Sequence, residues 1–112
     1  MVNKPYVPDS GDVVWLNLNP TLGREQKNRR PVLVLSPKSY NQKSSLVVAC
    51  PITTKIKGYP FEVQIINEGV DNVVLSDQVR ALDWRERDID FYFRAPTAVL
   101  HEVQAKLATL LF

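Results

Sequence analysis

The octapeptide RPVLVLSP at residues 30–37 contains an uninterrupted apolar run, VLVL at 32–35. A short continuous apolar run bounded by turn residues is typical of a β-strand that is covered on both faces. The residue before a proline is restricted to extended backbone, so Pro31 sets the geometry where this strand begins. We therefore expect a buried strand at 32–35, preceded by a long polar loop at 19–30 and followed by a helical turn after Pro37.

Other short apolar runs, separated by prolines, glycines and polar turn residues, predict further strands. Apolar and polar residues alternate along 61–65, which indicates a strand with one face in water. After Pro96 the apolar residues fall three and four positions apart, which predicts a helix with Thr97 as its N-cap. The chain thus reads as mainly β, a barrel or sandwich followed by one helix. The expected strands are 12–18, 32–35, 46–50 (ended by Pro51), 61–65, 73–75, 79–82 and 91–93, with a turn at 67–69, and the helical core stripe is Leu100, Val103, Leu107 and Leu110.

Length and composition restrict the class of protein. A chain of 112 residues with 45% apolar and 23% charged residues predicts one globular domain over 1–112. Cys50 and His101 are the only residues of their types, which excludes an internal disulfide and a two-histidine nuclease within one chain. No apolar run approaches the ~20 residues of a membrane helix, and residues 1–11 lack the apolar region of a secretory signal, so we expect a cytoplasmic protein.

The net charge of +2 hides an asymmetry. Residues 1–58 carry nine Lys or Arg against three acids, whereas residues 59–112 carry five against nine. A basic half indicates an anionic partner, of which nucleic acid is the commonest. The alternative is a solvated surface with scattered lysines.

Two polar clusters are candidate sites. The first is GREQKNRRP at 23–31, with four cations and one acid, Glu25, in a predicted loop. Arg30 stands directly before Pro31, so its backbone should be fixed and its planar guanidinium can bind a phosphate through two hydrogen bonds. The second is PITTKIKG at 51–58, where two threonines and two lysines follow an apolar strand. The alternatives are a mobile basic loop and a solvated turn with threonines that favour β-structure.

Other conspicuous residues have simpler interpretations. Cys50 lies in an apolar strand and is expected to be a small buried side chain rather than a nucleophile. Trp15 and Trp84 are expected to pack rather than to stack on bases. The mixed-charge run at 83–88 predicts a solvated turn, and His101 is expected to face solvent.

Six segments, taken together, resemble the MazF/PemK family of endoribonuclease toxins from bacterial toxin–antitoxin pairs. They keep the order and spacing of that family across nearly the whole chain. The resemblance implies an SH3-like β-barrel with a C-terminal helix, active as a homodimer. The segments are YVPDSGD at 6–12, NPTLGREQ at 19–26, RPVLVLSP at 30–37, PITT at 51–54, KGYPFEV at 57–63 and DQVR at 77–80.

The same resemblance implies an activity and assigns residues to it. It implies cleavage of single-stranded RNA, mainly mRNA, without a metal ion or cofactor, to a 2′,3′-cyclic phosphate and a 5′-hydroxyl. The pattern assigns the catalytic positions to Glu25, Arg30 and Thr53. From their chemistry, Arg30 would stabilise charge on the phosphate and Thr53 would donate a hydrogen bond, while Glu25 would act as a base or an orienting group. The RNA-binding candidates by charge are Lys27, Arg29, Lys55 and Lys57, and those by resemblance are Gln78 and Arg80. Arg29 is also an alternative to Arg30 as the residue that contacts the phosphate.

The resemblance also implies a partner. Toxins of this family are neutralised by a cognate, MazE-like antitoxin, expected to be acidic, whose disordered C-terminal tail covers the RNA groove. An alternative within the same fold is a toxin that acts by binding a protein target such as DNA gyrase.

Overall fold

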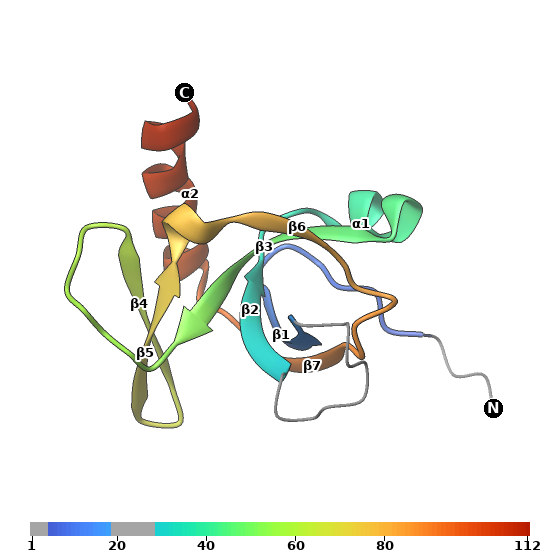
Figure 1. The fold of residues 1–112 in the computed structure, drawn as a ribbon, viewed down its shortest axis with the longest axis horizontal. Helices are drawn as coiled ribbons and strands as arrows, with labels where there is room; N and C mark the ends of the chain where they lie inside the picture. The colour runs from blue at the N-terminus through green and yellow to red at the C-terminus, as the bar shows by residue number, and fades with distance from the viewer. Residues whose placement is uncertain (1–4, 19–28) are drawn as a thin grey trace.

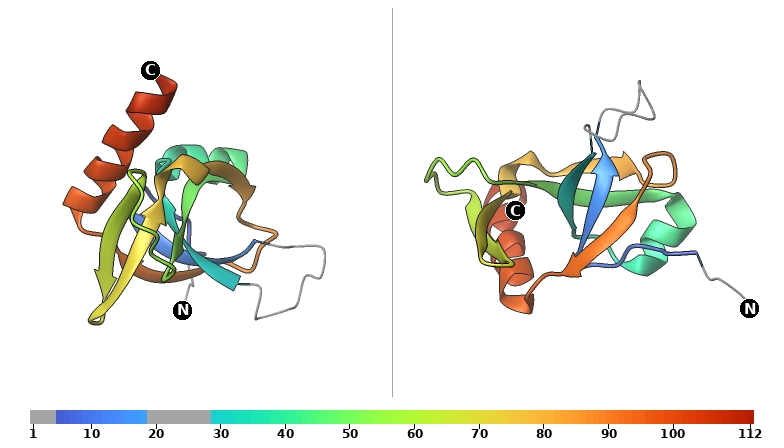
Figure 2. Two further views of the ribbon diagram at one scale, coloured as in Figure 1. Left: turned by 60° about the vertical axis from the view of Figure 1, so that its left-hand side comes forward. Right: turned by 90° about the horizontal axis from the view of Figure 1, so that it is seen from below.

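The computed structural model describes residues 5–18 and 29–112 as a mainly β structure with two α-helices (Figure 1). The strands are antiparallel and curve around a common centre into a partly open barrel (Figure 2). The elements are β1 (Asp12–Asn17), β2 (Arg29–Val34), α1 (Lys38–Ser44), β3 (Leu46–Thr53), β4 (Glu62–Asn67), β5 (Val70–Leu75), the 3-10 turn η3 (Ser76–Gln78), β6 (Arg80–Asp83), β7 (Asp90–Arg94) and α2 (Thr97–Leu111).

Strand β3 is the centre of the sheet, whose order is β4-β5-β3-β2-β1-β7. Along one edge it pairs with β2, from Val34↔Ala49 to Val32↔Pro51. Along the other edge residues 46–49 pair with β6 and residues 52–53 pair with β5. The strand therefore belongs to the barrel over its first half and to the β4–β5 hairpin at its end.

Two apolar cores lie on opposite faces of the central strands. Leu33 and Cys50 belong to the core beneath α2, together with Val103 and Leu107 of that helix. Val32 and Val34 face the second core inside the barrel, which includes Trp84. Since successive residues of a strand point to opposite faces, a strand between two cores must be apolar at every position. This explains the VLVL run at 32–35.

The β4–β5 hairpin turns tightly. Glu68 and Gly69 both have positive φ, 52° and 77°, as a two-residue type I′ turn requires. The hairpin stands beside α2 at one end of the molecule, with α1 at the other end (Figure 1). Within residues 5–18 and 29–112, no helix combines the length and the hydropathy needed to cross a lipid bilayer.

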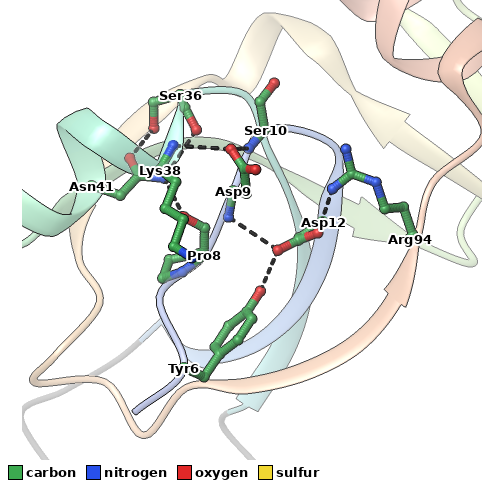
Figure 3. A network of polar contacts seen from close by, with 9 residues as sticks. All are labelled: Tyr6, Pro8, Asp9, Ser10, Asp12, Ser36, Lys38, Asn41 and Arg94. Atoms are coloured by element: carbon green, nitrogen blue, oxygen red, sulfur yellow. Dashed lines mark hydrogen bonds and ion pairs between the residues drawn. The ribbon is translucent and has the colours of Figure 1, made fainter. Parts of the chain in front are cut away.

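A polar network ties the N-terminal segment to the barrel (Figure 3). Asp12 is buried and accepts hydrogen bonds from the Tyr6 hydroxyl, the Asp9 amide and Nη1 of Arg94, the last at 2.7 Å. Burial and the hydrogen bond to Asp12 raise the pKa of Tyr6, so its phenol stays protonated and remains a donor. The network thus fixes residues 6–12 against β7.

Most of the expected elements are confirmed. All seven strands, the turn at 67–69, the segment after Pro37 and the C-terminal helix lie where the sequence predicted them. The mainly β architecture with a C-terminal helix is confirmed as well.

Some boundaries were wrong. Strand β3 does not end at Pro51 but continues to Thr53. Pro51 lies where the pairing partner of β3 changes from β6 to β5, and at that point the edge requires no backbone N–H, so a proline can be part of the strand. Strand β2 begins at Arg29, because Asn17 and Leu16 pair with Arg29 and Arg30, so both arginines lie on a strand rather than in a loop. Pro96, not Thr97, occupies the N-cap position of α2.

The expected stripe of α2 was wrong at its last position. Val103 and Leu107 are buried and Leu100 packs partly against their core, but Leu110 is 51% exposed. The helix extends past the edge of the sheet (Figure 2), and Leu110 is not among the residues that pack in the core beneath it.

We predict that Asn41→Ala destabilises the fold. The Asn41 side chain is fully buried, donates to the carbonyl oxygens of Pro8 and Ser36, both at 2.9 Å, and accepts from the Ser36 hydroxyl. Truncation leaves these buried groups unpaired, so the free energy of unfolding should fall by about 3 kcal/mol. The measurement is urea unfolding at one protein concentration. The exposed neighbour Gln42 provides the control, and Gln42→Ala should change that free energy by less than about 0.5 kcal/mol.

Candidate functional site

A cleft of about 560 Å³ opens between the barrel and the β4–β5 hairpin. It holds the two described catalytic candidates, Arg30 and Thr53, and we call it the Arg30–Thr53 cleft. Its walls come from β1, β2, β3, both strands of the hairpin and β7. The polar and aromatic side chains that line it belong to Trp15, Arg30, Thr53, Thr54, Lys55, Asn67, Glu68, Asn72, Tyr92 and Phe93.

Arg30 lies on β2, opposite Leu16 and directly before Pro31. Its side chain is exposed, and Nη1 donates to the Arg29 carbonyl oxygen at 3.1 Å. The strand ladder fixes its backbone, as the sequence predicted. The guanidinium is therefore presented from a rigid element to the cleft, where a planar donor can bind an anion.

Thr53 is the last residue of β3, opposite Val73 of β5. Its Oγ1 accepts a hydrogen bond from the Lys55 amide at 3.0 Å. A hydroxyl that accepts through a lone pair keeps its hydrogen for donation. The turn that this bond closes also brings the Lys55 side chain to the cleft, so a hydroxyl donor and an ammonium lie in the same cleft as Arg30.

The neighbouring Arg29 has a different environment. Its Nη2 lies 2.6 Å from Oδ2 of Asp90, and its Nε lies 3.9 Å from Oδ2 of Asp88. Only 17% of its side chain is exposed. Arg29 thus pairs with carboxylates, and of the two arginines Arg30 is the one that lines the cleft.

Residues 54–61 form the loop after β3, and Glu62 holds it in place. Its two carboxylate oxygens accept from the Lys57 and Gly58 amides at 2.9 and 2.8 Å. Gly58 has a φ of +83°, a conformation that favours glycine. The loop is also tied by the Tyr59 hydroxyl, which donates to Asp77. Lys57 is exposed on this loop, outside the lining of the Arg30–Thr53 cleft.

Gln78 and Arg80 do not join the Arg30–Thr53 cleft. They line a second hollow of about 300 Å³, together with Val32 and Pro51. Pro31 and Ile52, the neighbours of Val32 and Pro51 in sequence, line the first cleft, so the two hollows lie on opposite faces of the β2–β3 pair.

The remaining sequence candidates divide into two groups. Glu25, Lys27 and Arg24 lie outside the described residues. Cys50 is buried in a core as expected, and burial, followed by the charge of Asp77, raises the pKa of its thiol to about 12, so it is protonated at neutral pH. Trp84 is buried and its Nε1 donates to the Asn41 carbonyl oxygen, while His101 is exposed on α2. Among the described residues, no three His, Cys, Asp or Glu side chains come together as a metal site.

No pattern in the sequence indicated that Trp15, Asn67 and Tyr92 meet in the cleft. Trp15 was expected to pack, and it does contact Tyr92, with ring centroids 5.0 Å apart, but it is only partly buried and lines the cleft. These residues come from β1, β4 and β7, so their meeting depends on strand pairing across the whole chain.

Comparison with known proteins identifies the family. Residues 9–111 match the family model described as PemK-like, MazF-like toxin of type II toxin–antitoxin system. The chain is 42% identical to the endoribonuclease toxin MazF of Escherichia coli K12, over 95% of this chain and 96% of that protein. It is 30% identical to the Escherichia coli endoribonuclease PemK, over 99% of this chain and 87% of that one.

Solved structures agree with the sequence comparison. The crystal structure of MazF from Deinococcus radiodurans superposes with a TM-score of 0.84 at 53% identity, covering 96% of this chain and 98% of that chain. The MazE–MazF crystal structure from the same organism gives a TM-score of 0.84 at 49% identity, covering 96% and 97%. The chain therefore belongs to the PemK/MazF family, the endoribonuclease toxins of bacterial type II toxin–antitoxin systems.

Proposed function

We propose that this protein cleaves single-stranded RNA at a short sequence, without a metal ion, and leaves a 2′,3′-cyclic phosphate and a 5′-hydroxyl. The observation that carries the proposal is the convergence of Arg30 from β2 and Thr53 from β3 on one cleft. Cleavage of mRNA in the cytoplasm would inhibit translation and growth. The alternative, a toxin that only binds a protein target such as gyrase, gives no role to that convergence.

The proposed reaction is an intramolecular transesterification. The 2′-hydroxyl loses its proton and its oxygen forms a bond to phosphorus. The bond to the 5′-oxygen breaks, and that oxygen takes up a proton, from water or from the protonated base, to become the 5′-hydroxyl. Negative charge accumulates on the phosphoryl oxygens between these events. Arg30 can stabilise that charge with two parallel N–H donors, and the Thr53 hydroxyl can donate to one of the same oxygens. Glu25 is proposed as the base for the 2′-hydroxyl or as the group that orients it.

RNA binding is proposed to use the basic residues around the cleft. Lys55 lines it, and Lys57 is presented by the loop that Glu62 fixes. Both can neutralise backbone phosphates, as can Lys27 and Arg29. Gln78 and Arg80 are proposed to contact RNA on the other face of the β2–β3 pair, where they line the second hollow.

The proposed assembly is a homodimer neutralised by an acidic antitoxin. The similarity to MazF in MazE–MazF crystal structures supports an antitoxin partner. We propose that the antitoxin has a disordered, acidic C-terminal tail that lies across the RNA groove and orders on binding. The cations that attract RNA would attract this tail by the same electrostatics.

We expect Arg30→Ala to lower kcat by about 10²–10³, because it removes a donor that acts on charge developing in the transition state. Arg30→Lys should not restore kcat, since a point charge lacks the paired donors. The measurement is single-turnover cleavage of an RNA whose cleavage site has been mapped by sequencing 5′ ends. Arg85, exposed on the far side of the barrel, provides the control Arg85→Ala, which should cleave normally. Normal cleavage by Arg30→Ala, with Arg29→Ala inactive, would assign the phosphate contact to the other arginine.

Cleavage should continue in excess EDTA with a rate constant within about twofold of the untreated rate. Arg30 and Lys55 make the cleft cationic, which disfavours a divalent ion there, and the guanidinium can supply the charge stabilisation that a metal provides in other nucleases. The assay compares chelated protein with protein given Mg²⁺ or Mn²⁺. Loss of cleavage on chelation and recovery with Mg²⁺ would contradict this proposal.

Inhibition by the antitoxin should be competitive with RNA and should weaken as salt rises. Reversing charge in the loop, with Lys55→Glu and Lys57→Glu together, should weaken binding of the antitoxin tail by about tenfold or more, because two attractive contacts become repulsive. The double variant Lys38→Glu with Lys43→Glu on α1, at the other end of the molecule, is the charge-matched control. Calorimetric titration gives the affinities. Equal affinity for the doubly reversed variant would show that the tail binds another face.

A further inference from the structure

Strand β7 carries a β-bulge at Tyr92. Val13 of β1 pairs with Phe93, and the next residue, Val14, pairs with Phe91, so Tyr92 is an extra residue between two ladder pairs. A bulge of this kind changes the direction of a side chain and is common beside active sites. Here it leaves Tyr92 38% exposed, with its ring in the lining of the Arg30–Thr53 cleft.

Contacts from three strands hold the Tyr92 ring in one orientation. Its centroid lies 5.0 Å from the Trp15 ring at an interplanar angle of 35°, and 4.9 Å from the Phe93 ring at 77°. The Asn67 side-chain amide donates to the Tyr92 hydroxyl oxygen at 2.6 Å. The aromatic pair Trp15–Tyr92, which we call the aromatic shelf, is therefore preorganised, with little side-chain freedom to lose on binding.

The aromatic shelf lies beside the proposed catalytic arginine. Trp15 pairs with Pro31 across β1 and β2, and the next pair along the ladder is Leu16 with Arg30. Both rings line the same cleft as Arg30 and Thr53. Asn72 and Glu68 of the hairpin line this cleft as well, so polar groups that can meet the edge of a base surround an apolar surface.

We propose that the aromatic shelf stacks a nucleobase of the nucleotide adjacent to the scissile phosphate. The proposal rests on the RNA cleavage proposed above and adds the subsite that receives a base. Single-stranded RNA is commonly bound by stacking splayed bases on aromatic side chains beside phosphate contacts. A shelf that is exposed, rigid and adjacent to Arg30 meets these requirements. It also gives a physical reason for a single-stranded substrate, since a paired base cannot reach it.

The kinetic test combines a change in the protein with a change in the RNA. The substrate is a short RNA with the mapped cleavage site, either intact or lacking one base next to the scissile phosphate. Tyr92→Ala should lower kcat/KM on intact RNA by about tenfold or more, and removal of the stacked base should lower it by a similar factor for the wild type. For Tyr92→Ala, removing that base should cost little more, because the two changes delete the same contact.

Two further variants separate stacking from folding. Tyr92→Phe keeps the ring and loses the bond to Asn67, so it should retain kcat/KM within about threefold. Phe91→Ala removes an even more exposed aromatic residue next to Tyr92 that does not line the cleft, and should leave kcat/KM unchanged. Thermal unfolding of each variant shows whether it is folded at the assay temperature.

A binding measurement tests the shelf without turnover. In Trp84→Phe, Trp15 is the only tryptophan, and its fluorescence should be quenched by a short single-stranded RNA whose cleavage-site ribose lacks the 2′-hydroxyl. The same oligonucleotide without the adjacent base should bind with little quenching. Equal quenching by both oligonucleotides, or additive losses in kcat/KM from Tyr92→Ala and removal of the base, would refute base stacking on the aromatic shelf without contradicting RNA cleavage. A wild-type protein that cleaves no RNA would overturn the proposed function, and the quenching measurement would still decide the shelf.

Discussion

Strand β3 exchanges one neighbour for another halfway along its length, and the rest of the structure depends on this exchange. Residues 46–49 bond to β6 and complete the barrel, while residues 52–53 bond to β5 and attach the hairpin. The pairing with β2 on the opposite edge reaches Pro51 and keeps β3 in register as the change occurs. Pro51 has no N–H to donate, and it stands where the changing edge requires none. The cleft lies next to this junction, because Thr53, which lines the cleft, follows Pro51 by two residues.

Two adjacent arginines of β2 have different surroundings. Arg29 turns toward Asp90 at the start of β7 and forms an ion pair at 2.6 Å, which links β2 to a strand on the other side of β1. Arg30 turns toward the cleft. One cation thus serves the architecture, while the next is presented to the cleft. The two side chains are chemically identical, so the distinction comes from their surroundings.

The sequence predicted those features that depend on local rules. Hydrophobic period and turn residues placed every strand and the C-terminal helix, and Arg30 before Pro31 was correctly expected to have a fixed backbone. Pairing partners were beyond these rules, because they join residues far apart in the chain. Pro51 was therefore misread as the end of a strand, and Arg29 and Arg30 as loop residues. The bulge at Tyr92 depends on register between β1 and β7, so the meeting of Tyr92 with Trp15 was not predictable from spacing.

The Glu62 carboxylate holds the loop at 54–61 through hydrogen bonds from the main-chain amides of Lys57 and Gly58. Bonds to the main chain do not depend on which side chains the loop carries. The arrangement requires Gly58, with its positive φ, and Glu62 itself, and the Tyr59 hydroxyl ties the same loop to Asp77. The side chains of residues 54–57, all exposed, can therefore be exchanged over evolutionary time while the loop keeps its shape. The conformation of the loop and the ligand that it recognises therefore depend on different residues. Descendants of one ancestor can diverge in what they recognise while the fold around the loop stays the same.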